Sequence, residues 1–188
     1  AYFDTLTGIY NRKAIEEILE KKNIETKRNK GSFAVAMIDL DHFKKINDNY
    51  GHQMGDKLLI LFVKAIEEIL SKSDIFARIG GEEFAILVSQ IDSKNAYNLA
   101  EDIRKEVKNI TINYEGKDIS LTTSIGLTQN LETDHSCEDI FSRADMALYQ
   151  AKNSGRNQTC CSKNSDPKIN FSYSFQQIYF TLLLDGME

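Results

Sequence analysis

The chain has 188 residues, of which 41% are hydrophobic and 27% charged, and its formal net charge is −5. A chain of this length can bury one compact core and still carry a tail. The mild acidity argues against a nucleic acid polymer as a partner, because proteins that bind the phosphate backbone usually present a net basic surface. A nucleotide substrate, which needs only a few well-placed cations and a metal ion, is compatible with this charge.

Cysteine usage and hydropathy indicate a cytoplasmic domain. The cysteines are odd in number and Cys160 is adjacent to Cys161, a pattern that argues against a disulfide framework and suits a reducing compartment. No apolar stretch is long enough to cross a bilayer, and no signal peptide is visible. The first sequence motif begins at Asp4, close to the first residue of the sequence. We therefore expect a domain cut from a longer protein, with an N-terminal sensor, regulatory region or membrane anchor outside this sequence.

The first half of the chain contains two long helical patterns around one strongly apolar run. Apolar residues at helical spacing predict an amphipathic helix over residues 11–22. Residues 33–38 form a nearly continuous apolar run, typical of a buried central strand, and the acidic pair Asp39 and Asp41 follows directly. A short helical segment comes next, and residues 56–70 have the spacing of a second long helix.

The middle of the chain predicts a hairpin followed by another helix. Residues 74–79 and 84–91 are apolar runs on either side of Gly80 and Gly81. A diglycine in this position indicates a hairpin, because glycine reaches the positive φ angles that such turns require. Residues 93–110 then carry apolar side chains at helical spacing.

The last part of the folded region predicts a second hairpin and a final helix. Residues 111–114 and 119–128 read as its two strands. Ser136 can cap the helix, with Asp139 three residues later in the capping-box position, and Gly155 can end it. This order of elements predicts an α+β fold in which helices flank a central, mainly antiparallel sheet.

A change in composition predicts a boundary near the end of the last helix. We assign residues 1–157 to one domain. Residues 158–188 are polar at first and then aromatic, and they contain the only proline. This tail is interpreted as a final strand, a linker or the start of a further segment.

Three carboxylates are candidate ligand groups. Asp39 follows a buried strand, which is where open α/β-type sheets place ligand groups, although a lone Asp there is more often a cap or turn residue. Glu82 and Glu83 follow the diglycine, where a solvated turn is the ordinary interpretation. A hairpin tip beside a strand end can bring three hard oxygen ligands together, which suits magnesium bound with substrate phosphates.

Basic and amide side chains near these carboxylates are candidate nucleotide contacts. Taken singly, Asn47 and Asp56 are ordinary helix-start residues. Together, an amide and a carboxylate can read the Watson–Crick edge of guanine, where N1 and N2 donate and O6 accepts. The basic residues are either phosphate partners or surface charges; they are Lys44, Lys45, Lys152 and Arg156.

A series of motifs, in a fixed order over residues 4–157, resembles those of the GGDEF domain family. The matching segments are Asp4–Arg12, Ile38–Asp48, Gly51–Asp56, Gly80–Phe84, Ser124–Gly126 and Ala144–Asn157. The fourth segment reads Gly-Gly-Glu-Glu-Phe, a form of the motif that names the family. The resemblance implies a fold similar to class III nucleotide cyclases and polymerase palms. It also implies diguanylate cyclase activity, which joins two GTP molecules into cyclic di-GMP and releases pyrophosphate.

The resemblance implies a role for each matching carboxylate. Asp39, the backbone carbonyl of Leu40 and Glu83 would hold two Mg²⁺ or Mn²⁺ ions per active site. Glu82 would act as the catalytic base and share a metal. Each domain would hold one GTP, so a homodimer would be needed for catalysis.

The same resemblance assigns the nucleotide contacts. Asn47 and Asp56 would bind guanine, and the retained Asp56 favours guanine because relatives that accept adenine often differ there. Lys44, Lys152 and Arg156 would bind phosphates.

One motif of the family is degenerate. Many relatives carry an Arg-x-x-Asp motif that five residues separate from the first motif glycine, and the product binds there and inhibits. This chain has Ser71 and Asp74 in those positions, with Lys72 displaced by one. Lysine does not replace the bidentate recognition of arginine, so weak or absent product inhibition is expected.

Two other interpretations remain beside an active cyclase. A catalytically inactive GTP-binding regulatory GGDEF module would keep the same motifs without turnover. A binding module for cyclic di-GMP is disfavoured because serine replaces arginine at position 71.

Overall fold

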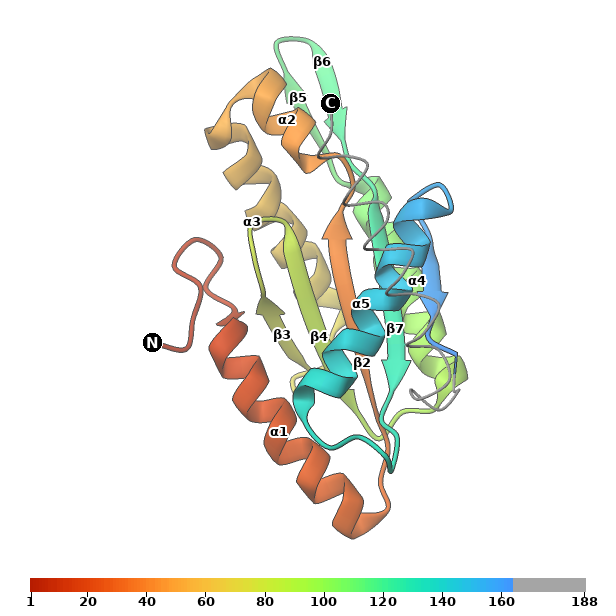
Figure 1. Cartoon of the computed structure of the whole chain (residues 1–188). Helices are drawn as coiled ribbons and strands as arrows, with labels where there is room; N and C mark the ends of the chain where they lie inside the picture. Colours follow the sequence, from red (N-terminus) through yellow and green to blue (C-terminus); the bar gives the residue numbers. More distant parts are fainter. Residues whose placement is uncertain (164–188) are drawn as a thin grey trace, which may run out of the picture.

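Residues 1–163 are described by the computed structural model, in which helices cover both faces of a sheet (Figure 1). In chain order the elements are β1 (Tyr10–Asn11), α1 (Arg12–Asn29), β2 (Phe33–Leu40), α2 (Phe43–Tyr50), α3 (His52–Ile69), β3 (Ile75–Arg78), β4 (Glu83–Ser89), α4 (Ser93–Asn109), β5 (Thr111–Tyr114), β6 (Lys117–Ser120), β7 (Thr123–Gln129), α5 (Cys137–Asn153) and β8 (Thr159–Cys161). The tail prediction falls mostly on residues 164–188, which lie outside the described residues.

The central sheet has six strands in the order β1-β3-β4-β2-β7-β8. The inner pairings β3–β4, β4–β2 and β2–β7 are antiparallel. The edge pairings β1–β3 and β7–β8 are parallel. The predicted α+β fold with a mainly antiparallel sheet is therefore confirmed, and the two edge strands make the sheet mixed.

The central strand β2 is buried along its whole length because helices cover both of its faces. Side chains alternate along a strand. Val35 and Met37 therefore join the apolar cluster under α1 and α5, whereas Ala36 and Ile38 join the cluster with α3 and α4. Figure 1 shows α1 and α5 in front of the sheet and α3 and α4 behind it. Because the odd-numbered side chains face α5, Asp39 is directed toward that helix.

Helix α5 lies directly against β7 at Gly126. A Cβ added to this glycine would lie 2.2 Å from the carbonyl oxygen of Ala144 and 2.2 Å from the amide nitrogen of Leu148. Only glycine permits this approach of backbone to backbone. The contact sets the distance of α5 from the sheet, and with it the position of Lys152 near the helix end.

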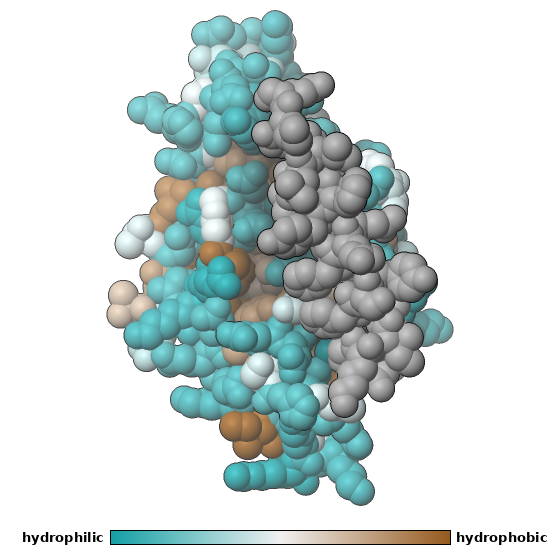
Figure 2. All heavy atoms as spheres, in the orientation of Figure 1, coloured by the Kyte–Doolittle hydropathy of each residue, from teal (hydrophilic) through white to brown (hydrophobic). Residues whose placement is uncertain are grey.

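The described surface on the α1 and α5 side is mostly hydrophilic (Figure 2). Both helices turn most of their apolar side chains inward onto the sheet, and Ile24, Met146 and Tyr149 are the large apolar side chains of these helices that stay exposed. None of the helices within residues 1–163 combines the length and apolar character needed to cross a membrane.

Two helices are longer than their apolar spacing predicted. α1 continues to Asn29 because its later turns bury polar side chains, Asn23 and Thr26. Asn23 donates to the carbonyl oxygen of Asp134 at 3.3 Å, a contact that apolar periodicity cannot reveal. α3 begins at His52, so Asp56 lies one turn inside the helix and is not a helix-start residue.

The predicted strand over residues 119–128 is wrong as a single element. β6 pairs with β5 in a separate two-stranded sheet, whereas β7 belongs to the central sheet. The chain changes direction at Leu121, which is buried, and Thr122, whose hydroxyl donates to Asp41 at 2.7 Å. Burial of the first and the polar contact of the second separate the two strands.

The hairpin between β3 and β4 is confirmed, but its predicted reason is wrong. Neither Gly80 nor Gly81 has a positive φ angle. The turn is closed by the amides of Ile79 and Gly80, which donate to the carbonyl oxygen of Glu83 at 2.8 and 3.2 Å. A Cβ on Gly80 would lie 3.0 Å from Glu83 Oε2, so the absent side chain makes room for this carboxylate.

Ser136 occupies the predicted cap position of α5, but its hydroxyl does not cap the helix. Glu20 of α1 supplies the acceptor instead, and its Oε2 receives the amide of Cys137 at 2.8 Å. Asp139 accepts from the amide of His135 at 2.7 Å. A neighbouring helix thus replaces the local cap that the sequence pattern predicted.

Candidate active site

The predicted metal-binding residues meet where β2 ends beside the beginning of β4. Asp39 and Glu83 are direct partners in the antiparallel register. Directly opposed residues point to the same face of a sheet, so both carboxylates face the α5 side. The amide of Leu40 donates to the carbonyl oxygen of Glu82 at 3.1 Å. The hairpin tip is thereby fastened to the end of the central strand.

A lysine from α5 reaches the same place. Lys152 Nζ lies 2.7 Å from Asp39 Oδ2. Asp39 is only 8% exposed, and Lys152 is half-buried. Among the described residues, this ammonium is the hydrogen-bond donor to the Asp39 carboxylate. The charge of the buried Asp39 is therefore balanced by one half-buried lysine side chain.

Burial and crowding of negative charge shift the pKa values of this group. Burial raises the pKa of Asp39, and the salt bridge to Lys152 offsets this only in part. Burial also raises the pKa of Glu82, and the negative charge of Asp39 adds to the effect. Asp145 of α5 contacts solvent, yet the surrounding protein and the charge of Glu83 raise its pKa as well. These carboxylates lie where a cation would relieve their repulsion.

Asp41 accepts hydrogen bonds that hold together the segments around the carboxylates. Its Oδ1 accepts from the Ser124 hydroxyl at 2.7 Å. Its Oδ2 accepts from the Thr122 hydroxyl at 2.7 Å and from the Asn157 amide at 3.0 Å. The buried Asp41 thus ties the end of β2 to β7 and to the segment after α5, and it has a structural role.

The two predicted guanine-binding residues lie on neighbouring helices. Asn47 of α2 packs against Gly55 of α3, next to the exposed Asp56. A Cβ on Gly55 would lie 1.9 Å from Asn47 Oδ1, so this glycine allows the close contact of the two helices. Within the described residues, Asn47 Oδ1 is buried without a hydrogen-bond partner.

The other predicted phosphate partners extend into solvent. Lys44 is exposed on α2, and Arg156 is exposed just after α5. Arg156 and Asn157 both have left-handed backbone angles, with φ of 62° and 46°. This local backbone strain is held by the bond from Asn157 to Asp41. The structure brings Lys152 to the carboxylates but leaves Lys44 and Arg156 free to approach a ligand from solvent.

The donor set fits a divalent ion that is bound together with substrate. Within residues 1–163, no cluster of three or more His, Cys, Asp or Glu side chains is arranged to hold a metal alone. Mg²⁺ usually binds through one or two carboxylates plus substrate phosphates and keeps several waters. Asp39 and Glu83 supply such carboxylates, and the cation now beside Asp39 is the Lys152 ammonium.

The degenerate Ser71–Asp74 segment forms a self-contained turn. Asp74 Oδ2 accepts from the amide of Ser71 at 2.8 Å. A recess of about 330 Å³ lies beside this turn, with Phe3, Tyr10 and Phe76 in its wall. It is lined by none of the predicted catalytic or nucleotide-binding residues, so this recess is separate from the carboxylate cluster.

Sequence reasoning missed several residues that shape the site. Arg78 contacts both the hairpin glycines and Asp4. Arg104 of α4 donates to Asn157 Oδ1 at 3.0 Å and so supports the segment that carries Arg156. Both arginines lie outside the signature pentapeptide, and their contacts are visible only in three dimensions.

The comparisons with known proteins agree with this geometry. The family described as "Diguanylate cyclase, GGDEF domain" matches residues 1–158. Diguanylate cyclase DgcP of Pseudomonas aeruginosa is 38% identical over 158 residues, which are 84% of this chain and 23% of that protein. Diguanylate cyclase A of Treponema denticola is 42% identical over 139 residues, or 74% of this chain and 38% of that protein. The chain therefore spans well under half the length of these curated relatives.

A solved structure supports the same grouping. The GGDEF domain of DgcB from Caulobacter crescentus, determined in complex with c-di-GMP, has a TM-score of 0.82 and 32% sequence identity. The similarity covers 86% of this chain and 95% of that one. The family match, the shared fold and the converging carboxylates lead to one conclusion: this chain belongs to the GGDEF domain family of diguanylate cyclases.

Proposed function

We propose that this domain is an active diguanylate cyclase that condenses two GTP molecules into cyclic di-GMP and two pyrophosphates. The proposal is carried by the meeting of Asp39, Glu82 and Glu83 where β2 ends and β4 begins, beside Lys152. Raised pKa values at Asp39 and Glu82 support it, because such shifts concentrate where a site is built to bind or move charge.

The chemistry is an in-line displacement at phosphorus. The 3′-oxygen of one GTP forms a bond to the α-phosphorus of the other, and the bond to the pyrophosphate oxygen breaks. Glu82 accepts the proton of the 3′-hydroxyl, and its raised pKa makes it a stronger base than an ordinary glutamate. A second transfer of the same kind closes the ring.

Asp39, Glu83 and the carbonyl oxygen of Leu40 would hold two Mg²⁺ or Mn²⁺ ions. When bound, such ions neutralise the phosphate charge and lower the pKa of a coordinated hydroxyl. The fit rests on two carboxylates that share one face of the sheet and on the buried Asp39, whose cationic partner within residues 1–163 is Lys152.

The nucleotide would lie between the Asp39, Glu82 and Glu83 carboxylates and the helices α2 and α3. Asn47 and Asp56 would read guanine, and the amide oxygen of the half-buried Asn47 already lies against Gly55. The phosphates would be bound by Lys44, Lys152 and Arg156.

Catalysis by this proposal requires a homodimer in which each domain presents one GTP to the other. We further infer a cytoplasmic location and a sensor or regulatory region outside this sequence. These inferences follow the family expectation, and the short span of the chain relative to DgcP is compatible with further domains.

The test is product formation by the purified domain at high concentration with GTP and Mg²⁺, followed by chromatography and mass spectrometry. We expect cyclic di-GMP from the wild type and none from Glu83→Ala. Glu132→Ala is the matched control, because Glu132 is exposed beyond the opposite end of β7. It should retain wild-type turnover.

The competing function is a catalytically inactive module that binds GTP and regulates a partner. GTP binding without product, even when a fused coiled coil forces dimerisation, would replace the cyclase proposal with this one. Equal turnover by Glu83→Ala and the wild type would refute the assigned role of Glu83.

Product inhibition through the Ser71–Asp74 turn should be weak. Asp74 is engaged with the backbone of Ser71, and no arginine is present there to bind phosphate or guanine bidentately. The measurement is initial rate against added cyclic di-GMP, with Ser71→Arg as the variant expected to tighten inhibition. A wild-type curve as steep as that of Ser71→Arg would contradict the prediction.

A further inference from the structure

One guanidinium holds the backbone of the signature hairpin. Arg78 Nε donates to the carbonyl oxygen of Gly80 at 3.0 Å and to that of Gly81 at 3.2 Å. Its Nη2 donates to the same Gly81 oxygen at 2.7 Å. The arginine at the end of β3 therefore spans the whole diglycine that precedes Glu82 and Glu83.

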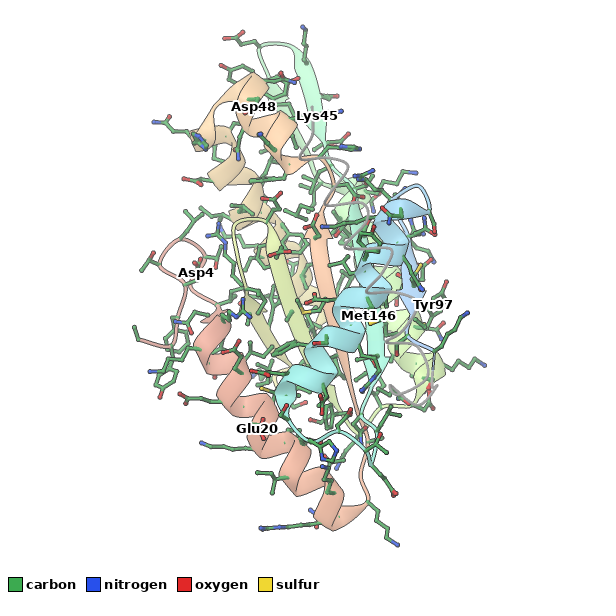
Figure 3. The ribbon with its side chains drawn as sticks, in the orientation of Figure 1. Asp4, Glu20, Lys45, Asp48, Tyr97 and Met146 are labelled. Carbon is green, nitrogen blue, oxygen red and sulfur yellow. The ribbon has the colours of Figure 1, made fainter. Side chains whose placement is uncertain are left out.

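The other end of the same guanidinium binds the N-terminal turn. Arg78 Nη1 lies 3.2 Å from Asp4 Oδ2 and 3.3 Å from Asp4 Oδ1. Both side chains are about four-fifths buried, with exposed fractions of 16% and 20%. Figure 1 shows the N-terminal turn beside the hairpin that joins β3 to β4, and Figure 3 labels Asp4 within that turn.

Asp4 is itself firmly positioned. Its Oδ2 accepts from the amide of Thr7 at 2.9 Å and from the Thr7 hydroxyl at 2.6 Å. Partial burial opposes ionisation, but the bonds from Thr7 and the charge of Arg78 hold the pKa of Asp4 below its usual value. The backbone of the turn is closed by Asp4 N to Ile9 O and Gly8 N to Asp4 O, both at 2.8 Å.

The pairing of β1 with β3 makes this link short and stiff. Asn11 is the parallel partner of Arg78, and Tyr10 is the partner of Ala77. Asn11 also caps α1 by accepting from the amide of Ala14 at 3.0 Å. A displacement of residues 1–11 would therefore be passed to Arg78 through both the strand and the ion pair.

The diglycine needs such support for a physical reason. Two consecutive glycines have the largest backbone freedom of any dipeptide. Neither Gly80 nor Gly81 sits in a positive-φ conformation that would define a tight glycine turn. Contacts from outside must therefore select the conformation that directs Glu82 and Glu83 toward Asp39.

We propose that Arg78 is a positioning residue that locks the diglycine turn and couples it, through Asp4, to the N-terminal turn. In this arrangement the N-terminal turn controls how well Glu82 and Glu83 are presented to substrate. The catalytic consequence rests on the proposed cyclase function, whereas the mechanical link between the two turns does not.

The variants separate the two halves of the link. Arg78→Gln removes both halves, and Arg78→Lys keeps a charge for Asp4 but cannot hold both glycine carbonyls with one ammonium. Asp4→Asn removes the charge of the ion pair and leaves one amide oxygen to accept from Thr7. Arg28→Gln is the matched control, because Arg28 is exposed in the last turn of α1.

The first measurement is hydrogen–deuterium exchange, which does not depend on catalysis. We expect faster exchange of the amides of residues 79–83 in Arg78→Gln and Arg78→Lys. Asp4→Asn should speed exchange in residues 79–83 and also in residues 4–9. The control Arg28→Gln should change exchange in neither segment. Unchanged exchange of residues 79–83 in all Arg78 and Asp4 variants would overturn the proposal.

The second measurement is steady-state kinetics well below the melting temperature. Misplacing reactive groups by about 1 Å can cost on the order of 100-fold in rate. We expect Arg78→Lys to lower kcat by roughly 10- to 100-fold with little change in KM for GTP, and Asp4→Asn to lower it less. A lowered melting temperature with unchanged kcat would mean a merely structural ion pair and would reject the positioning role.

A double-mutant cycle tests the coupling itself. If Asp4 acts through Arg78, Asp4→Asn should have no further effect on kcat or on exchange of residues 79–83 in an Arg78→Gln background. If Arg78→Gln does not fold, the cycle uses Arg78→Lys instead. Fully additive losses would reject the link. Should the wild type make no cyclic di-GMP, the cyclase proposal would fail, and the exchange data alone would decide the mechanical link.

Discussion

Two buried aspartates at opposite ends of the sheet differ in how well they are satisfied. Asp39, at the end of β2, has one hydrogen bond from Lys152 among the described residues. Asp134, beyond the far end of β7, accepts two bonds from Arg143 and one from the amide of Leu131. A half-satisfied carboxylate is available to a cation, whereas a saturated one stabilises the fold.

The same contrast extends to the neighbouring carboxylates. Asp39, Glu82 and Asp145 all have raised pKa values, so their ionised forms are disfavoured in the folded state. Their contribution to stability is full below their unfolded pKa values and is lost as the pH rises through their folded ones. At neutral pH the catalytic end therefore carries an electrostatic cost that a bound cation would remove.

The largest expected effect on activity comes from replacing Asp39, the aspartate with few hydrogen-bond donors. Asp39→Asn should lower cyclic di-GMP synthesis by at least about 100-fold, because changes even to outer partners of metal ligands cost about 10- to 100-fold. The free energy of unfolding should change little, since Asp39 ionises at a cost in the folded protein. Product assays and thermal melting in parallel check both statements. A severe loss of stability would show that Asp39 is a structural residue like Asp134.

The second effect, on the free energy of unfolding, comes from replacing Asp134, the aspartate whose carboxylate accepts three hydrogen bonds. Asp134 is 1% exposed and Arg143 also donates to the carbonyl oxygen of Gln129, so Asp134→Asn leaves a buried arginine without its charge partner. Breaking such a pair costs about 3–5 kcal/mol. Chemical denaturation should report this loss, while kcat per folded molecule should stay near the wild-type value. Loss of kcat in a fully folded Asp134→Asn sample would contradict the separation of the two ends.

These two ends also differ in how far the sequence could predict them. Asp39, Glu82 and Glu83 were found because the strand pattern and the family motifs place them at a strand end and a hairpin tip. The structural acid Asp41 was not assigned, because its partners lie 81, 83 and 116 residues away in the chain. Contacts at such separations leave no local pattern, and the same holds for Arg78 and Asp4.

Local periodicity predicted the presence of the elements better than their ends. The buried run of β2 was visible because both of its faces are apolar. The division between β6 and β7 was missed because Leu121 reads as a strand residue, although it is buried at a change of direction. The hairpin at Gly80 was found for the wrong reason, since its conformation depends on Glu83 and Arg78 rather than on a positive φ angle.

A smaller effect concerns the titration of Glu82. Burial and the charge of Asp39 raise its pKa, so its basic form is lost on acidification at a higher pH than for an ordinary glutamate. Carboxyl-carbon NMR of Glu82 should show this raised pKa directly. Asp39→Asn should lower the pKa of Glu82, because a nearby negative charge is removed. The same pKa in both proteins would mean that Asp39 does not act on Glu82.

The smallest effect tests the electrostatic cost alone. Asp145 has a raised pKa and reaches solvent, so screening reduces its contribution. Asp145→Asn should raise the melting temperature by roughly 1 °C at pH 8 and leave it unchanged at pH 3, where the aspartate is protonated in both states.

Glu101 should shift the melting temperature in the opposite direction, because the hydrogen bond from Arg104 lowers the pKa of Glu101. Glu101→Gln should therefore lower the melting temperature at pH 8. This difference from the wild type should vanish as the pH falls through the pKa of Glu101 in the folded protein. If both substitutions shifted stability in the same direction at pH 8, the contrast between the cluster at the catalytic end and the ion-paired carboxylates would not be electrostatic.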